Sequence, residues 1–204
     1  EAYARYDVVN SDEEWKDLLQ KMSLPYMHQR IILDVIKDNP QKVGEIILDN
    51  IKQMASSLGI LCLTPDNDNI TMWAHYTDNN KGACVEFDIL EDCKLFLLPK
   101  KVEYSDDIVC LNYIAEQNRA MESLYHKSTK WSYENEYRVI KTGFRGSRKF
   151  NKKALRSIVF GVDTRPEEIQ RIKEMAARNG FDHVAFKQAR LSQNSILKFD
   201  IVEL

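Results

Sequence analysis

The sequence predicts an α+β protein whose sheet is mixed or largely antiparallel, with an N-terminal helical segment and two inserted helices. Three observations predict this class. Residues 1–58 carry apolar side chains at helical spacing. Residues 59–204 are mainly short alternating segments, which are typical of antiparallel or mixed sheets and not of all-parallel ones. Helices first and strands later favour α+β, and the length suits a single domain over 1–204, with 1–58 as its helical part and 59–204 as its sheet-containing core.

The N-terminal part is predicted to contain successive helices. Ser11 and Glu14 form a capping-box pattern before the first of them. The segment "YMHQRIILDVIKD" has the apolar spacing of a second helix. A third is expected to begin at Asn39 and Pro40, a residue pair suited to a helix start, and to end at Gly59.

Strands and a short helix are expected next. "ILCLT" reads as a strand, and Asn69 is expected to cap a helix over 70–76. "ACVEFDI" alternates, which predicts a strand with an apolar face that includes Ala83, Val85 and Phe87. A further strand is expected around Pro99.

The C-terminal half is predicted to hold both inserted helices. The segment 106–127 reads as a long helix, and Pro166 and Gly180 are expected to bound another. Strands are predicted for "YENEYRVIKTGF" and "LRSIVFGV", and a closing pair of strands for "DHVAFKQARL" and "SILKFDIVEL".

Composition narrows the function classes. A net charge of −2 gives no global field for nucleic acid, although the basic run over 141–156 leaves a local phosphate contact open. No apolar run approaches the roughly 20 residues of a membrane span, and no signal peptide is visible at the start of the chain. The four cysteines form no C-x-x-C pair; Cys62 and Cys84 are expected to be buried free thiols. A cytoplasmic protein without zinc is predicted.

The segment "NITMWAHYTDNNKGACVEFDI" is the first candidate wall of a site. Trp73 and Tyr76 share a helix face, which is core in one interpretation and a pocket wall in another. His75 would hydrogen-bond a ligand or move a proton, or bond the backbone. Lys81 could reach a phosphate or carboxylate, and Glu86 is a candidate acid if its strand face lines a cleft.

The segment "KWSYENEYRVI" supplies the second constellation. On a strand from Tyr133, the side chains of Glu134, Glu136 and Arg138 project to one side. Arg138 can neutralise Glu136 and fix its orientation, which leaves Glu134 freer to bind a ribose hydroxyl, an amine or a metal-bound water. The alternative is an exposed ladder of salt bridges on a solvated sheet face.

These two segments resemble the blocks Met-Trp-(Ser/Ala)-His-Tyr…Asn-x-Lys-Gly and Trp-x-x-Glu-x-Glu-(Tyr/Trp)-Arg of an uncharacterised bacterial family, Domain of Unknown Function 2971. Trp131 matches the tryptophan of the second block. The resemblance implies a bacterial cytosolic protein and no established activity. Members open with a Tyr-Lys-Tyr strand and an Asn-Asp-Pro-Phe turn, which this sequence lacks, so it is expected to begin after them.

The Glu134-x-Glu136 pair also looks like the Glu-x-Glu element of NAD-using ADP-ribosyltransferases. That resemblance implies that Glu136 grips the nicotinamide ribose, that Glu134 helps the acceptor, and that His75 or Tyr76 faces the nicotinamide. No Ser-Thr-Ser strand of that class is evident.

Three functions follow as hypotheses. The first is an enzyme, or a descendant of one, that binds a nucleotide-like ligand, with NAD as a possible cofactor. The second is a non-catalytic binding or defence-associated module whose polar network is structural, and the third is a metal-dependent phosphodiester hydrolase. The predicted catalytic residues are His75, Glu134 and Glu136, and the predicted ligand-binding residues are Trp73, Tyr76, Lys81, Glu86, Trp131 and Arg138.

Overall fold

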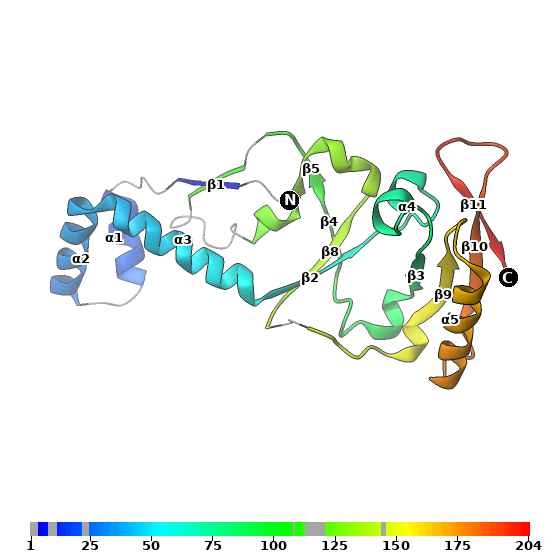
Figure 1. Cartoon of the computed structure of the whole chain (residues 1–204). Coiled ribbons are helices and arrows are strands. Elements are labelled where there is room, and N and C mark those ends of the chain that lie inside the picture. The colour runs from blue at the N-terminus through cyan, green and yellow to red at the C-terminus, as the bar shows by residue number, and fades with distance from the viewer. Residues whose placement is uncertain (1–3, 8–11, 22–24, 108, 113–120, 144–145) are drawn as a thin grey trace. The chain divides into compact units, whose positions relative to one another are not determined.

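A computed structural model describes residues 4–7, 12–21, 25–107, 109–112, 121–143 and 146–204 (Figure 1). The chain divides into two compact units. The first unit contains Glu1–Ile60, Val102–Trp131 and Ile140–Gly146, and the second contains Leu61–Lys101, Ser132–Val139 and Ser147–Leu204.

Three helices begin the first unit: α1 (Asp12–Lys21), α2 (Tyr26–Asp38) and α3 (Pro40–Ser57). Helix α1 buries Trp15 and Leu19, whereas no residue of α2 is buried. Pro40 occupies the first turn of α3, as predicted. The predicted end at Gly59 is wrong, because Leu58 is already extended and starts β2 (Leu58–Leu63). The capping residue predicted for α1, Ser11, lies outside the described residues.

The long helix predicted over 106–127 is wrong for the residues described there. They form β6 (Val109–Asn112), the 3-10 helix η3 (Glu122–Tyr125) and β7 (His126–Lys127). Strand β6 pairs in parallel with β1 (Ala4–Asp7), and β7 pairs in parallel with β5 (Glu103–Tyr104). A short apolar run fits a strand or a helix equally well, and here a partner far away in the sequence selects the strand.

A mixed four-stranded sheet organises the second unit, as the sequence predicted. Its order is β11-β10-β9-β3, from β11 (Phe199–Glu203), β10 (Ala185–Leu191), β9 (Leu155–Phe160) and β3 (Ala83–Phe87). Strands β9 and β10 are parallel, and the other two pairs are antiparallel. Helix α5 (Pro166–Arg178) provides the crossover that two parallel neighbours require. The predicted closing pair, β10 and β11, is confirmed.

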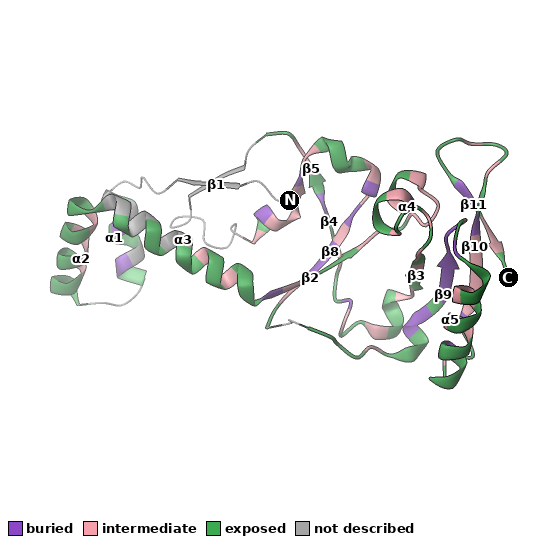
Figure 2. Cartoon of the chain, viewed as in Figure 1, coloured by how far each residue is buried: buried purple, intermediate pink, exposed green. Residues whose placement is uncertain are grey.

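The core of this unit lies on both sides of β9 (Figure 2). Val159 packs with Trp73 of α4 (Ile70–Tyr76), while Ile158 and Phe160 pack with the cluster that includes Ile169 and Ile172 of α5. A strand covered on both faces is apolar at successive positions, and this explains the run Ile158, Val159 and Phe160.

Strand β3 differs from the prediction in which face is covered. Cys84 packs against the Trp73 cluster, whereas the side chain of Val85 remains half exposed. Phe87 is partly buried through its contacts with Phe96 and Phe150. The predicted apolar face is therefore covered only at its Phe87 end, after a register shift between Glu86 and Phe87.

A second sheet has the order β2-β8-β4, from β2, β8 (Tyr137–Thr142) and β4 (Lys100–Lys101). The strand predicted from Tyr133 is wrong at its start, because Tyr133 and Glu134 end the 3-10 helix η4 (Thr129–Glu134). Asn135 then adopts a left-handed φ of 44°, which separates η4 from β8. Two further 3-10 helices are η1 (Ile89–Asp92) and η5 (Lys152–Ala154). In the described part of the chain, no helix has the length and apolar character needed to cross a membrane.

Candidate functional site

Asn69 fixes the start of α4 and links it to the end of η4. Its side-chain oxygen accepts hydrogen bonds from the backbone N–H groups of Thr71 and Met72, which confirms the predicted cap. Its side-chain nitrogen donates to the carbonyl oxygen of Tyr133 at 3.0 Å. One amide therefore holds together two segments that are separated by 64 residues.

Trp73 lies in the core. It is 3% exposed, packs edge-on against Phe199, and donates its indole N–H to the carbonyl oxygen of Asn67 at 2.8 Å. The tryptophan anchors α4 to the sheet. The structure therefore supports the interpretation that Trp73 is a core residue, not part of a pocket wall. Tyr76, on the same predicted face, is instead 62% exposed.

Tyr76 reaches the buried Glu134. Its hydroxyl group donates to Glu134 Oε1 at 2.8 Å, and Glu134 is only 3% exposed. Burial raises the pKa of Tyr76 well above its ordinary value, and the hydrogen bond to Glu134 and the neighbouring charges raise it further. The phenol therefore keeps its proton to a higher pH than a free tyrosine does, and it acts as a donor to the carboxylate.

His75 lies beside Tyr133 at the exposed end of α4. Its Nδ1 is 3.3 Å from the Tyr133 hydroxyl oxygen, and the two rings meet edge-on at 6.1 Å. The imidazole is exposed to solvent. An exposed imidazole next to a phenol can donate or accept a hydrogen bond with a bound molecule.

Glu136 and Arg138 form a buried bidentate ion pair. Arg138 donates from Nε to Glu136 Oε1 at 2.7 Å and from Nη2 to Oε2 at 2.9 Å. Burial lowers the pKa of Arg138. The hydrogen bond and charge of Glu136, together with the interaction with Cys62, have a larger opposite effect, so the pKa of Arg138 is raised overall. The predicted neutralisation of Glu136 by Arg138 is confirmed, and the exposed-ladder alternative is wrong because both residues are buried.

The remaining predicted residues have other surroundings. Glu86 accepts a hydrogen bond from the Ser157 hydroxyl group at 2.5 Å and forms an ion pair with Lys187 at 3.5 Å. The Ser157 bond lowers the pKa of Glu86, burial opposes it, and Lys187 lowers it further. Lys81 lines a separate cavity described below. Trp131 belongs to the first unit, where the Lys127 ammonium lies 4.9 Å from the centre of its ring.

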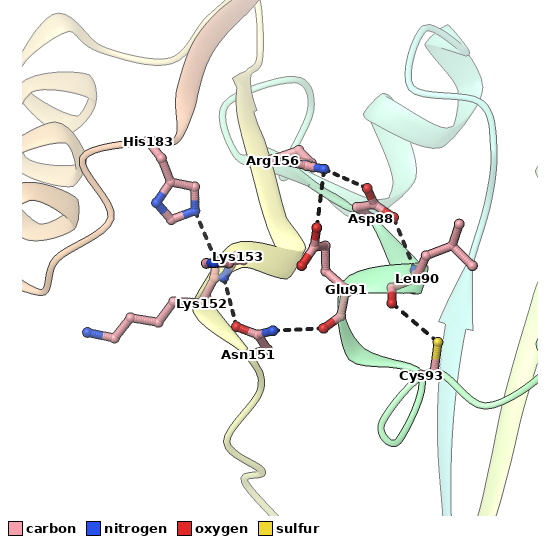
Figure 3. Close-up of polar contacts among 9 residues, drawn as sticks. All are labelled: Asp88, Leu90, Glu91, Cys93, Asn151, Lys152, Lys153, Arg156 and His183. Carbon is pink, nitrogen blue, oxygen red and sulfur yellow. Dashed lines mark hydrogen bonds and ion pairs between the residues drawn. The ribbon is translucent and has the colours of Figure 1, made fainter.

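Part of the basic run takes part in a polar cluster around Arg156 (Figure 3). Arg156 binds Asp88 Oδ2 at 2.7 Å and lies 3.8 Å from Glu91 Oε1. Asn151 donates to the carbonyl oxygen of Glu91 at 2.8 Å, and His183 bonds the carbonyl oxygen of Lys152 at 3.0 Å. These contacts join η1 to η5, so the Arg156 end of the run is tied into the fold. Phosphate binding by the rest of the run stays a prediction.

Sequence reasoning did not single out Tyr133, Asn69 or Cys62 as partners of the site. Tyr133 is next to Glu134 in the sequence, and this was the available signal. Cys62 was predicted to be buried but is exposed; it interacts with Arg138. Cys62, Cys84 and Cys93 form no disulfide bond.

The fold and site define an α+β protein in which a buried carboxylate lies behind exposed aromatic side chains. The model of a family described as Protein of unknown function (DUF2971) matches residues 72–139. The match supports assignment of the chain to this family, as the resemblance predicted. The matched segment includes both the His75–Tyr76 end of α4 and the Glu134–Arg138 stretch. No curated protein and no solved structure matches significantly.

Proposed function

We propose that the chain binds a nucleotide-like small molecule at the surface formed by His75, Tyr76 and Tyr133, with Glu134 as the hydrogen-bond acceptor behind it. The observation that carries this proposal is the 2.8 Å bond between an exposed phenol and a buried carboxylate. An ionised carboxylate only accepts hydrogen bonds, and ribose hydroxyl groups can donate them. Aromatic rings offer a surface on which a base can stack.

Glu136 has a supporting role in this proposal. The resemblance to ADP-ribosyltransferases implies that Glu136 grips a ribose, but both of its oxygens accept from Arg138 in a buried pair. We therefore assign the ligand contact to Glu134, which is buried too but is bonded by the hydroxyl group of the exposed Tyr76. The rigid Glu136–Arg138 pair would keep the preceding Glu134 in place, as a bidentate pair fixes orientation as well as charge.

NAD is the ligand that the Glu-x-Glu resemblance favours, in the cytoplasm of a bacterium. In the enzymatic form of the proposal, water or an acceptor replaces nicotinamide at the ribose carbon, with Glu134 taking the proton from the attacking group. His75 would bond the ligand from the exposed end of α4. Free thiols at the described cysteines support a reducing compartment.

The second candidate, a non-catalytic module with a structural polar network, is favoured by the buried Glu136–Arg138 pair. Metal-dependent hydrolysis has no comparable support. Among the described residues, no group of three or more His, Cys, Asp and Glu side chains is arranged to hold a metal ion.

Calorimetric titration with ADP-ribose and with NAD tests ligand binding. Glu134→Gln should weaken both affinities about tenfold, because it removes a charge-assisted hydrogen bond. The matched control is Glu174→Gln, which alters an exposed pair on α5 and should bind as the parent does. No binding of either ligand, or equal binding by the Glu134→Gln variant, would contradict the proposal.

Nicotinamide release and melting together separate the two candidates. Glu136→Gln should lower the melting temperature by roughly 6 °C or more, because breaking a buried pair costs about 3 to 5 kcal/mol. If the chain is an enzyme, the parent releases nicotinamide from NAD and Glu134→Gln abolishes the release. Release without any effect of Glu134→Gln, or abolished by Glu136→Gln at an unchanged melting temperature, would overturn the assigned roles.

A further inference from the structure

A cavity of about 210 Å³ lies in the second unit, between the turn that follows α4 and one face of α5. Its lining includes the apolar residues Ala83, Phe160 and Ile172 and the cations Lys81 and Arg171. None of its lining residues belongs to the His75–Glu134 surface. The cavity is therefore a second candidate site.

The Lys81 wall is built by a turn held against the end of β9. The hydroxyl group of Thr164 donates to the carbonyl oxygens of Lys81 and Gly82, each at 3.0 Å. The backbone N–H of Gly161 donates to the Gly82 carbonyl oxygen at 2.9 Å. A Cβ atom at Gly161 would lie 1.9 Å from the Asn80 carbonyl oxygen, so only glycine permits this approach. The backbone that carries Lys81 is thus fixed at several points.

Positive charge is in excess at the cavity. Arg171 forms no hydrogen bond or ion pair with any described residue, and the Lys81 ammonium has only a long contact of 3.9 Å to Asp78. The lining carboxylate, Glu168, is already bound by Arg165 at 2.7 Å. Two cations therefore line the cavity, and its one lining carboxylate is bound by Arg165 and interacts with Arg171 only through charge.

We propose that this cavity binds a small organic anion whose carboxylate or phosphate lies between Lys81 and Arg171 and whose apolar body contacts Phe160 and Ile172. The guanidinium of Arg171 offers a planar pair of donors suited to either group. The volume of about 210 Å³ lies below the roughly 300–1,000 Å³ of typical ligand pockets, which favours a small anion. The ligand proposed here is distinct from the nucleotide-like molecule proposed for the His75–Glu134 surface.

Amide NMR spectra of the whole chain, titrated with benzoate and with phenyl phosphate, test this inference. Both probes fit an apolar ring and one anionic group into the cavity, and benzyl alcohol is the neutral control. The amide signals of Lys81, Gly82 and Ile172 should shift with the anions and much less with the alcohol. The probe that binds more tightly identifies the preferred anionic group.

Two variants distinguish the contribution of the Arg171 charge from that of the cavity volume. Arg171→Gln should weaken binding about tenfold, and Ala83→Leu should weaken it by narrowing the cavity with both cations retained. Arg178→Gln, on the same helix and outside the lining, is the matched control and should bind as the parent does. The inference is overturned if neither anion shifts these signals, if benzyl alcohol shifts them equally, or if Arg171→Gln and Arg178→Gln behave alike.

Discussion

Tyr76 connects a largely exposed ring with the buried Glu134 carboxylate. Burial comes first among the causes that raise the pKa of this phenol above its ordinary value of 10.0, followed by the bond to Glu134. The folded state therefore holds the phenolic proton more tightly than the unfolded state does. Such a group contributes stability that is fully present below pH 10.0 and is lost as the pH rises above it.

Replacing Tyr76 by phenylalanine should remove the loss of stability that deprotonation of this phenol causes at alkaline pH. We expect the Tyr76→Phe variant to lose less stability than the parent between about pH 10 and about pH 12, above the ordinary pKa of tyrosine. Urea unfolding at a series of pH values measures the difference. Tyr26→Phe, at a tyrosine that is 74% exposed, should follow the parent curve. If the free energy of unfolding of Tyr76→Phe and of the parent fell equally at alkaline pH, the raised pKa assigned to Tyr76 would be contradicted.

Local spacing was enough to predict some contacts of the site and not others. Glu136 and Arg138 are two residues apart with opposite charges, and their pairing follows from that spacing. Tyr76 and Glu134 are separated by 58 residues, so no local pattern could predict their bond. The same separation applies to His75 and Tyr133.

At the scale of elements, the turn after α4 is unusual in its backbone. Asp78, Asn79 and Asn80 all adopt left-handed conformations, with φ values of 47°, 54° and 67°. Asn and Asp tolerate this region better than other residues that carry a Cβ atom. The carbonyl oxygen of Asn80 accepts from the backbone N–H of Asp163, so the turn is held by the loop after β9.

Two substitutions at Asn79 should measure the cost of this backbone. Asn79→Ala keeps a Cβ atom and should lower the free energy of unfolding by about 1 kcal/mol relative to Asn79→Gly. Both changes remove the same exposed side chain, so the glycine variant is the internal control. Chemical denaturation compares them. Equal stability of the two variants would show that the turn is not strained at this position.

Elements with local start and stop signals were predictable. Helix α4 follows its Asn69 cap, and α5 runs from Pro166 to Arg178, with Gly180 in a left-handed conformation beyond its end. The acidic start of the segment 106–127 suited a helix, but its β6 part is a strand because it pairs with β1, about a hundred residues earlier in the sequence. Non-local pairing of this kind is invisible to periodicity.

At the scale of the whole molecule, burial is concentrated on β9. Val159 and Phe160 are fully buried, and hydrogen-bonded neighbours lie on both sides of the strand. Helix α2 is the opposite case, since none of its residues is buried. Local opening requires least free energy where few apolar contacts must be broken.

Hydrogen exchange should reproduce this contrast. We expect the amides of β9 to exchange most slowly and those of α2 to exchange much faster, because α2 can open without exposing a core. Mass spectrometry of peptides after exchange measures both segments in one experiment. Protection in α2 equal to that in β9 would contradict the burial pattern.

The fold class was predictable because it depends on order and periodicity along the chain. Helices precede the mixed sheet, as the sequence indicated. The covered side of β3 was not predictable, because α4 packs against Cys84 while the Val85 side is left half exposed. Which side of an alternating strand is covered depends on elements elsewhere in the chain.

Asn69 serves two segments with one amide group. Its oxygen caps α4 and its nitrogen donates to the Tyr133 carbonyl group. An aspartate at this position would cap a helix equally well but would have no N–H to donate. An Asn69→Asp variant would therefore keep its short helix and lose the bond to Tyr133, and a circular dichroism spectrum alone would not detect the change.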